Sequence, residues 1–236
     1  MLNYAVDPEL LNHLVPAGTQ LDQFEGKTYV SLVGFRFLRM RVRGIWIPFH
    51  SDFDEVNLRF YVKREGAAPG QPGPPRRGVA FVREIVPRYA IAKVARAVYH
   101  ENYIALPMGH QVIEPTSEHG RIQAEYRWRH NRKWNSIRVE CSGRPALPPQ
   151  GSLDEFITEH YWGYARQPDG SGMEYHVEHD RWRIWTAAQA KFQGDTAALY
   201  GPGLAACLNR EPDSALLAQG SPVAVYPGHG IGLIRI

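Results

Sequence analysis

Regular alternation between apolar and polar residues is the feature that most constrains the fold of this chain. In the segment DEVNLRFYV, residues 54–62, the apolar Val56, Leu58, Phe60 and Val62 are separated by polar residues and one tyrosine. Successive side chains of a β-strand point to opposite faces of the sheet. The segment therefore predicts a strand with one apolar face and a second face that carries an acid, an amide, a base and a phenol.

Strand-like segments rich in β-branched and aromatic residues recur along most of the chain. They are expected at residues 28–42, 55–64, 79–86, 103–114, 121–130, 134–141, 161–166, 173–179, 181–187 and 230–236. Short helices are expected at residues 7–15, within 88–103, after the capping box of Ser152 and Glu155, and once in the tail. About nine or ten strands and three or four helices indicate a β-rich α+β fold.

Proline and glycine mark the loops between these segments. The stretch EGAAPGQPGPPRRG, residues 65–78, is the densest in both and is interpreted as a loop between two strands. GRPALPPQG, residues 143–151, separates the two halves of the chain, and Gly34 marks a bulge or a close backbone approach. Because no segment resembles a long linker, we expect one domain over residues 1–236.

Composition excludes several classes of protein. The net charge is only +3, and the basic pI comes from scattered arginines. The run RWRHNRKW, residues 127–134, is interpreted as two strands joined at HNRK, so no nucleic-acid partner is expected.

Cys141 and Cys207 have neither metal nor disulfide spacing. No signal-peptide pattern and no apolar run of about 20 residues is found, so we expect a cytoplasmic protein without a membrane partner.

Local motifs for nucleotide, metal or acyl chemistry are missing. The sequence has no P-loop, no GxGxxG after a strand and no GxSxG elbow. In HVEH, residues 176–179, His176 and Glu178 would share one face of a strand while His179 faces the other way, so the ligand set of a catalytic zinc is not assembled. We therefore expect no metal and no cofactor.

The polar face of residues 54–62 is the best candidate for a site. It carries Glu55, Asn57, Arg59 and Tyr61, and Arg83 lies in the next predicted strand. If these two strands are neighbours, carboxylate and guanidinium groups crowd one region. Buried charges are tolerated only when they are paired or hydrogen-bonded. The set is therefore either a buried polar lock or a socket for an anionic or carbonyl ligand.

Four longer runs carry a family resemblance. They are GTQLDQFEGKTYVSLVGFRF at residues 18–37, DEVNLRFYV at 54–62, GVAFVREIVPRYAIAKVARAVYHENYIALPM at 78–108 and EFITEHYWGYAR at 155–166. Over nearly its whole length the chain resembles the YqjF-like family of uncharacterised bacterial proteins, in the acetoacetate decarboxylase-like superfamily. The resemblance implies a curved antiparallel sheet that closes into a cone-like barrel or sandwich with an internal cavity.

The resemblance also implies where the chemistry differs. The decarboxylases use a lysine that forms a Schiff base with a keto acid, and a glutamate of their cavity corresponds to Glu55. Where that lysine is expected, this chain has Leu106, Pro107 and Met108, none of which forms an imine. Lys93 stands in the middle of the preceding helix, about three turns too early. Schiff-base decarboxylation is therefore not predicted.

Two functions follow as hypotheses. In the first, a cavity binds a small carbonyl or carboxylate compound and Glu55 acts as a general acid or base. Arg59 and Arg83 would then clamp an anionic group, while Asn57, Tyr61 and Tyr103 orient the ligand. In the second, the polar set is a structural lock in a non-catalytic sensor or interaction protein. Exposed edge strands are compatible with a homodimer.

Overall fold

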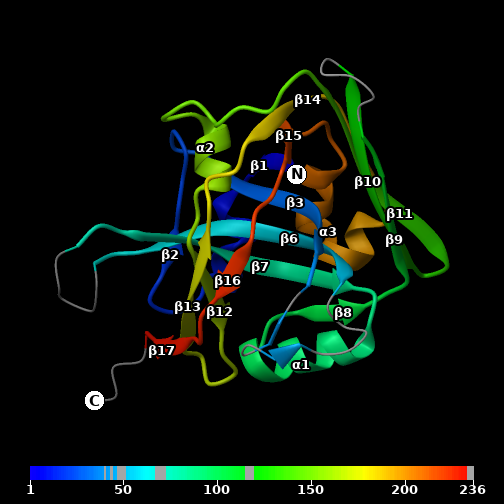
Figure 1. The fold of residues 1–236 in the computed structure, drawn as a ribbon. Helices are drawn as coiled ribbons and strands as arrows, with labels where there is room; N and C mark the ends of the chain where they lie inside the picture. Colours follow the sequence, from blue (N-terminus) through cyan, green and yellow to red (C-terminus); the bar gives the residue numbers. More distant parts are fainter. Residues whose placement is uncertain (40, 43–44, 47–51, 67–72, 115–119, 233–236) are drawn as a thin grey trace.

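The structure is a computed structural model that describes residues 1–39, 41–42, 45–46, 52–66, 73–114 and 120–232 (Figure 1). A long twisted sheet dominates it, and three helices pack against the faces of that sheet. The predicted β-rich α+β class is therefore confirmed. The centre of the predicted loop at residues 65–78 and the end of the predicted strand at 230–236 lie outside the described residues.

Within the described residues the main sheet contains 15 strands. Their order is β16–β13–β12–β7–β6–β3–β1–β15–β14–β11–β10–β9, with β17 beside β13, β2 beside β6 and β8 beside β7. The strands are β1 Leu2–Val6, β2 Gln20–Leu21, β3 Thr28–Phe37, β6 Phe53–Arg64, β7 Arg76–Val86, β8 Tyr103–Ala105, β9 Met108–Ile113, β10 Arg121–His130, β11 Lys133–Ser142, β12 Trp162–Arg166, β13 Gly172–His179, β14 Ile184–Gln193, β15 Ser214–Ala218, β16 Val223–Val225 and β17 His229–Ile231. Strands β4 Arg41–Val42 and β5 Ile45–Trp46 form a separate pair.

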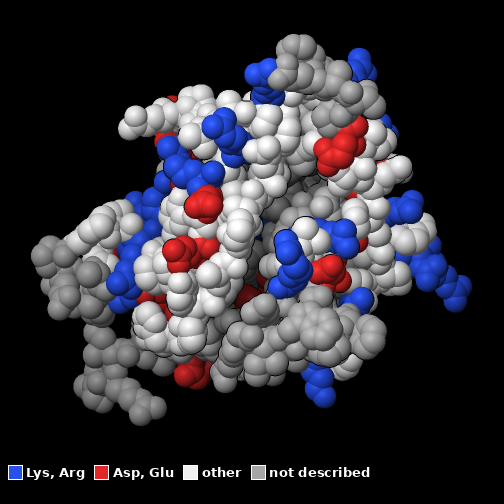
Figure 2. Space-filling view, viewed as in Figure 1, with Lys and Arg blue, Asp and Glu red and all other residues white. Residues whose placement is uncertain are grey.

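The sheet curls over itself but does not close. Its path ends at β9 and β16, and no pairing joins the described residues of these two strands, so the predicted closure into a barrel is not confirmed. The curl is nevertheless tight. A Cβ atom on Gly34 of β3 would lie 2.7 Å from Ile137 Cδ1 and 2.8 Å from the Tyr126 ring. The predicted bulge is not formed here, and the groups that approach this glycine closely are side chains rather than backbone. The space-filling view shows a hollow between the β13–β16 side and the β9–β11 side (Figure 2).

The first predicted helix is replaced by two 3₁₀ turns, η1 Pro8–Leu10 and η2 Asn12–Leu14. Asp7 caps the first turn as predicted, because its carboxylate accepts a hydrogen bond from the Glu9 amide at 3.0 Å. An α-helix cannot continue to Val15, since the residue before Pro16 is sterically pushed into an extended conformation.

Three α-helices cover the sheet: α1 Tyr89–Tyr99, α2 Leu153–Thr158 and α3 Thr196–Leu208. Helix α1 ends at His100, whose backbone is left-handed with φ 58°. Helix α2 begins at Ser152, whose hydroxyl accepts from the Glu155 amide at 3.2 Å, while the Glu155 carboxylate accepts from the Gly151 amide. The Ser152 half of the predicted capping box is therefore formed, whereas the Glu155 carboxylate binds the Gly151 amide and not that of Ser152.

Strand β6 is buried on both faces. Its four apolar residues lie in the main core between the curled sheet and α3, as the alternation predicts. The opposite face is not a solvated one, because Glu55 and Asn57 are only 2% and 3% exposed. Helices α1 and α2 contribute to two smaller apolar clusters on that side. Among the residues the structure describes, no helix has the length and apolarity needed to cross a membrane.

Candidate functional site

A cluster of buried carboxyl groups lies on the polar face of β6, β7 and β8. Strand pairing places Asn57 opposite Glu84, and Glu84 opposite Tyr103. Glu55 shares the Asn57 face because the two residues are two positions apart on one strand. Asn57 Nδ2 donates a hydrogen bond to Glu55 Oε1 at 3.0 Å, and the Tyr103 hydroxyl donates to Glu55 Oε2 at 3.3 Å. Hydrogen bonds from β6 and β8 thus hold Glu55 in place.

A third carboxyl group joins this cluster from the end of helix α1. Glu101 follows the left-handed residue that terminates the helix, and it is 9% exposed. The Tyr175 hydroxyl donates to Glu101 Oε1 at 2.7 Å. The Tyr175 ring lies across Gly163 of β12, where a Cβ atom would come within 2.0 Å of the ring. Only glycine therefore lets β13 deliver this phenol to Glu101.

Burial changes the proton affinity of all three glutamates. Desolvation raises the pKa of Glu55 to about 7, although the hydrogen bonds from Asn57 and Tyr103 oppose the shift. Desolvation raises the pKa of Glu101 to about 8, and the Glu55 charge contributes in the same direction. The pKa of Glu84 is raised well above its ordinary value by burial, then by the charges of Glu101 and Glu55. Near neutral pH the cluster therefore retains protons that it can exchange.

A cleft of about 520 Å³ reaches this cluster from the surface. It lies between the end of α1, strand β8 and the turn that joins β12 to β13. Its lining residues are Arg96, His100, Glu101, Asn102, Tyr103, Ile104, Arg166, Gln167 and Pro168. Exposed cationic groups from α1 and β12 thus stand at the rim, while Glu101 and Tyr103 connect the wall to the buried carboxyl groups.

The residues predicted from sequence fall into three separate groups. Glu55, Asn57 and Tyr103 meet in the carboxyl cluster. Arg59 and Tyr61 lie farther along the same face of β6, next to α2, where Arg59 Nη2 donates to the Ile157 carbonyl at 3.0 Å. Tyr61 shares a 2.5 Å hydrogen bond with the buried Ser31 hydroxyl. Neither of these two side chains contacts the carboxyl cluster through any hydrogen bond or ion pair between described residues.

Arg83 lies on the opposite face of the sheet. A register shift between Leu58 and Arg59 places Arg83 opposite Leu58, on the apolar face. Burial raises the pKa of Tyr200 of α3, and the positive charge of Arg83 opposes this rise. The expected pairing of Glu55 with Arg59 and Arg83 is therefore not formed. For Arg83 the cause is the bulge in β7, because one extra residue turns the side chains beyond it to the other face of the sheet.

Sequence reasoning gave no role to Glu84 and did not find Glu101 or Tyr175. Alternation alone places Glu84 on the Glu55 face only when the register of β6 and β7 is known. Glu101 stands in an irregular connection after a helix, where no periodic pattern applies. Among the described residues, no three His, Cys, Asp or Glu side chains are arranged to hold a metal ion.

The comparisons with known proteins agree with this fold. The model of DUF2071, a family of uncharacterized conserved proteins, matches residues 1–222. The chain belongs to the DUF2071 family. It is 25% identical over 190 residues to the uncharacterized protein YqjF of Bacillus subtilis strain 168, covering 78% of this chain and 71% of that protein.

Solved structures similar to this DUF2071 protein share the acetoacetate decarboxylase fold. Acetoacetate decarboxylase from Legionella pneumophila matches with a TM-score of 0.63 at 11% identity, over 98% of this chain and 82% of that chain. The enduracididine biosynthesis enzyme MppR complexed with pyruvate matches with a TM-score of 0.56 at 13% identity, over 98% and 84%. An acetoacetate decarboxylase-like enzyme from Sphingomonas wittichii RW1 matches with 0.56 at 14%, over 98% and 87%. At these identities the similarity establishes the fold alone.

Among the described residues of this DUF2071 protein, none of those that line the cleft is a lysine. Leu106 and Met108, in the segment where the resemblance calls for a lysine, pack against the main core. Lys93 is exposed on helix α1 and does not line the cleft. The polar side chains that line the cleft carry carboxyl, phenol, guanidinium, imidazole and amide groups.

Proposed function

We propose that the protein binds a small carbonyl or carboxylate compound in the cleft beside α1 and transfers a proton to or from it. The observation that carries the proposal is a set of three buried glutamates, with elevated pKa values, directly behind a cleft with a cationic rim. A general acid or base works best when its pKa lies near the working pH. Glu55 and Glu101 meet that condition, with pKa values of about 7 and 8.

The rim supplies the recognition of charge. Arg96 of α1 and Arg166 of β12 line the cleft and carry permanent positive charges. Guanidinium groups recognise carboxylates through two parallel hydrogen bonds. These two arginines take the clamping role that the sequence suggested for Arg59 and Arg83.

The wall supplies the proton transfer. Glu101 and Tyr103 line the cleft, and Tyr103 is hydrogen-bonded to Glu55. Glu55 therefore acts through Tyr103 as the acid or base, and Asn57 fixes its orientation through the 3.0 Å hydrogen bond. No step requires an amine nucleophile, which is consistent with the lining residues. The reaction class is proton transfer next to a carbonyl group, without an imine.

The test measures proton exchange directly. A panel of small keto acids and carboxylates is incubated with the protein in deuterated water, and loss of C–H signals next to the carbonyl is followed by NMR. We expect exchange of at least one compound by the wild type, and a decrease of roughly 100-fold in Glu55→Gln, the usual size of a general acid–base contribution. Arg166→Gln should weaken binding of the same compound.

Matched controls separate catalysis from folding. Glu65→Gln removes an exposed glutamate, and Arg138→Gln removes an exposed arginine away from the cleft. Both should behave like the wild type. If Glu55→Gln and Arg166→Gln exchange and bind every compound as the wild type does, the proposal is wrong and the cluster is a structural lock.

A further inference from the structure

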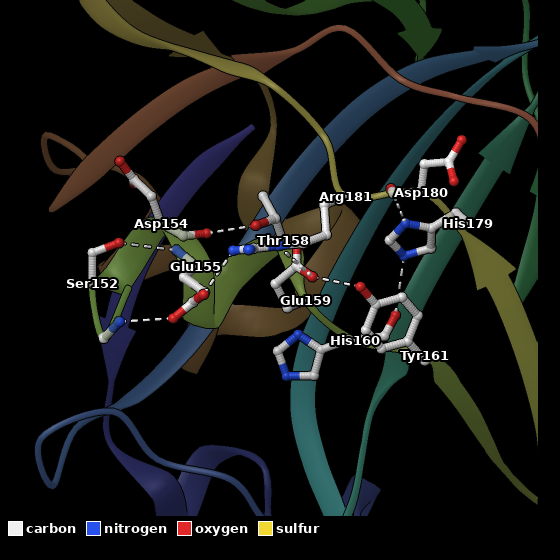
Figure 3. A network of polar contacts seen from close by, with 11 residues as sticks. Ser152, Asp154, Glu155, Thr158, Glu159, His160, Tyr161, His179, Asp180 and Arg181 are labelled. Atoms are coloured by element: carbon white, nitrogen blue, oxygen red, sulfur yellow. Dashed lines mark hydrogen bonds and ion pairs between the residues drawn. The ribbon is translucent and has the colours of Figure 1, made fainter. Parts of the chain in front are cut away.

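A second group of polar atoms without partners lies between helix α2 and strand β6. His160 follows α2 and is 6% exposed, yet neither ring nitrogen has a hydrogen-bond partner among the described residues. Figure 3 shows the surrounding side chains joined by dashed lines, while the His160 ring nitrogens have none. The buried Nε of Arg59 also lacks a partner. Two side chains therefore present unused hydrogen-bonding nitrogens in one buried region.

Aromatic rings hold these two side chains next to each other. The His160 ring lies 4.7 Å from the Tyr61 ring and 5.4 Å from the Phe156 ring, measured between centroids. The Arg59 guanidinium carbon lies 5.6 Å from the centroid of the same Tyr61 ring. The Arg59 hydrogen bond to the Ile157 carbonyl fixes one end of the guanidinium. Both groups are thus held beside Tyr61 by packing rather than by ionic partners.

The ion pairs of this region leave the Arg59 guanidinium without a carboxylate in contact. Arg77 is paired with Asp22 at 2.7 Å, which neutralises both groups. Arg59 has no carboxylate partner among the described residues, and Asp22 Oδ2 remains 3.9 Å from His160 Nε2. Burial lowers the pKa of His160 well below its ordinary value, with Arg77 and Arg59 adding to the effect, so His160 stays neutral. The nearby Glu159 is engaged by Tyr161 and Arg181. Arg181 bridges Glu155 and Glu159, so the formal charges of the region balance, but among the described residues no carboxylate contacts Arg59.

We propose that the region between β6 and α2 is a binding site for a small monoanion, a halide or a small carboxylate, held by Arg59 and His160. Arg59 is half-buried, with its Nε atom buried, and a cation in such a place without a counter-ion in contact costs free energy, as does a buried donor without an acceptor. One anion relieves both costs, because it accepts from Arg59 Nε and from the protonated nitrogen of the neutral imidazole. The Arg77 side chain, whose charge acts on His160, is 34% exposed, so the region lies near the surface.

The experiment measures unfolding temperature against anion concentration, at constant ionic strength maintained with sodium sulfate. Sodium bromide and sodium formate are the two probes. An anion that binds only the folded state raises the unfolding midpoint in proportion to the logarithm of its concentration above Kd. We expect this dependence in the wild type and its loss in Arg59→Gln and His160→Phe. A midpoint raised by bromide but not by formate would indicate a halide site. A midpoint raised by both anions would indicate a site that also accepts carboxylates.

Controls and a direct observation complete the test. Arg138→Gln and His13→Phe change exposed residues of the same types and should keep the dependence. Glu55→Gln should keep it too, so failure of the cleft proposal does not affect this one. Crystals grown in bromide should show an anomalous peak between Arg59 and His160. No saturable dependence in the wild type, an equal dependence in all variants, or no peak at this position would each overturn the proposal.

Discussion

The surroundings of Glu55 decide whether its carboxyl group is charged. Its position in an alternating segment places it on the polar face of β6, and helix α1 and strand β8 then remove that face from water. A carboxyl group buried without a cationic partner keeps its proton, since the charged form is the one that loses hydration. The Glu55 charge in turn contributes to the raised pKa values of its neighbours Glu84 and Glu101 by like-charge repulsion.

The pH dependence of stability follows from these pKa values. The unfolded chain releases the Glu55 proton near pH 4.5, while the folded protein holds it up to about pH 7. Between these values the folded state binds more protons at Glu55 and Glu101, so the contribution of these two groups to stability falls as pH rises and levels off above about pH 8. We expect Glu55→Gln to be more stable than the wild type at pH 8, by up to roughly 3 kcal/mol.

Urea unfolding at several pH values measures this difference. Glu65→Gln, which changes an exposed carboxylate, should retain the wild-type pH dependence. If the stability of Glu55→Gln relative to the wild type does not increase between pH 5 and pH 8, Glu55 is ionised in the folded protein, contrary to the structure.

The sequence predicted part of the candidate site, and the prediction failed where the site depends on which strands pair. Alternation correctly placed the apolar residues of β6 in the core, because that rule depends on one strand only. The partners of Glu55 depend on pairing between strands that are far apart in sequence. One bulge in β7 moved Arg83 to the other face, and an irregular turn after α1 supplied Glu101 instead.

At the scale of elements, a buried ion cluster does form, but at another place. Glu174 of β13 is fully buried and accepts from Arg64 at 3.0 Å and from Arg76 at 2.5 Å. Tyr164 donates to its second oxygen at 3.0 Å. A buried polar lock of the kind that the sequence suggested for Glu55 is thus formed around Glu174, and it joins β6, β7, β12 and β13. Elements with strong local signals were predicted well, whereas the helix at residues 7–15 was limited by Pro16.

The contact between β3 and the β10–β11 hairpin gives the prediction at this scale. Gly34→Ala would place a methyl group 2.7 Å from Ile137 Cδ1 and 2.8 Å from the Tyr126 ring. Overpacking of this kind typically costs about 1–3 kcal/mol, so the unfolding midpoint in urea should fall. Gly109→Ala in β9 is the matched control, because its nearest neighbour would be 3.6 Å away. Equal stability of both variants would show that the sheet is less tightly curled.

At the scale of the whole molecule, one sheet connects distant parts of the chain. Strand β1 lies between β3 and β15, with Asn3 opposite Ser31 and Ser214. This order could not be read from the sequence, since alternation identifies strands but not their neighbours. The open ends at β9 and β16 are a further result of pairing that no local pattern encodes.

The continuity of this sheet predicts cooperative unfolding. We propose that residues 1–236 form one domain, and we expect tryptophan fluorescence and far-ultraviolet circular dichroism to give the same urea midpoint. Loss of the β1–β15 pairing would disrupt both halves of the sheet together. Two separate transitions would instead indicate that the halves on either side of residues 143–151 unfold independently.

The central place of β1 also bears on synthesis of the protein. Its partner β15 is made only when residues 214–218 emerge from the ribosome, long after β3 has emerged. Throughout that interval one edge of the nascent sheet has unpaired backbone groups, which invite pairing with other chains. The final shape is therefore reached only at the end of translation, and a ribosome that stalls before residue 214 would release an aggregation-prone fragment.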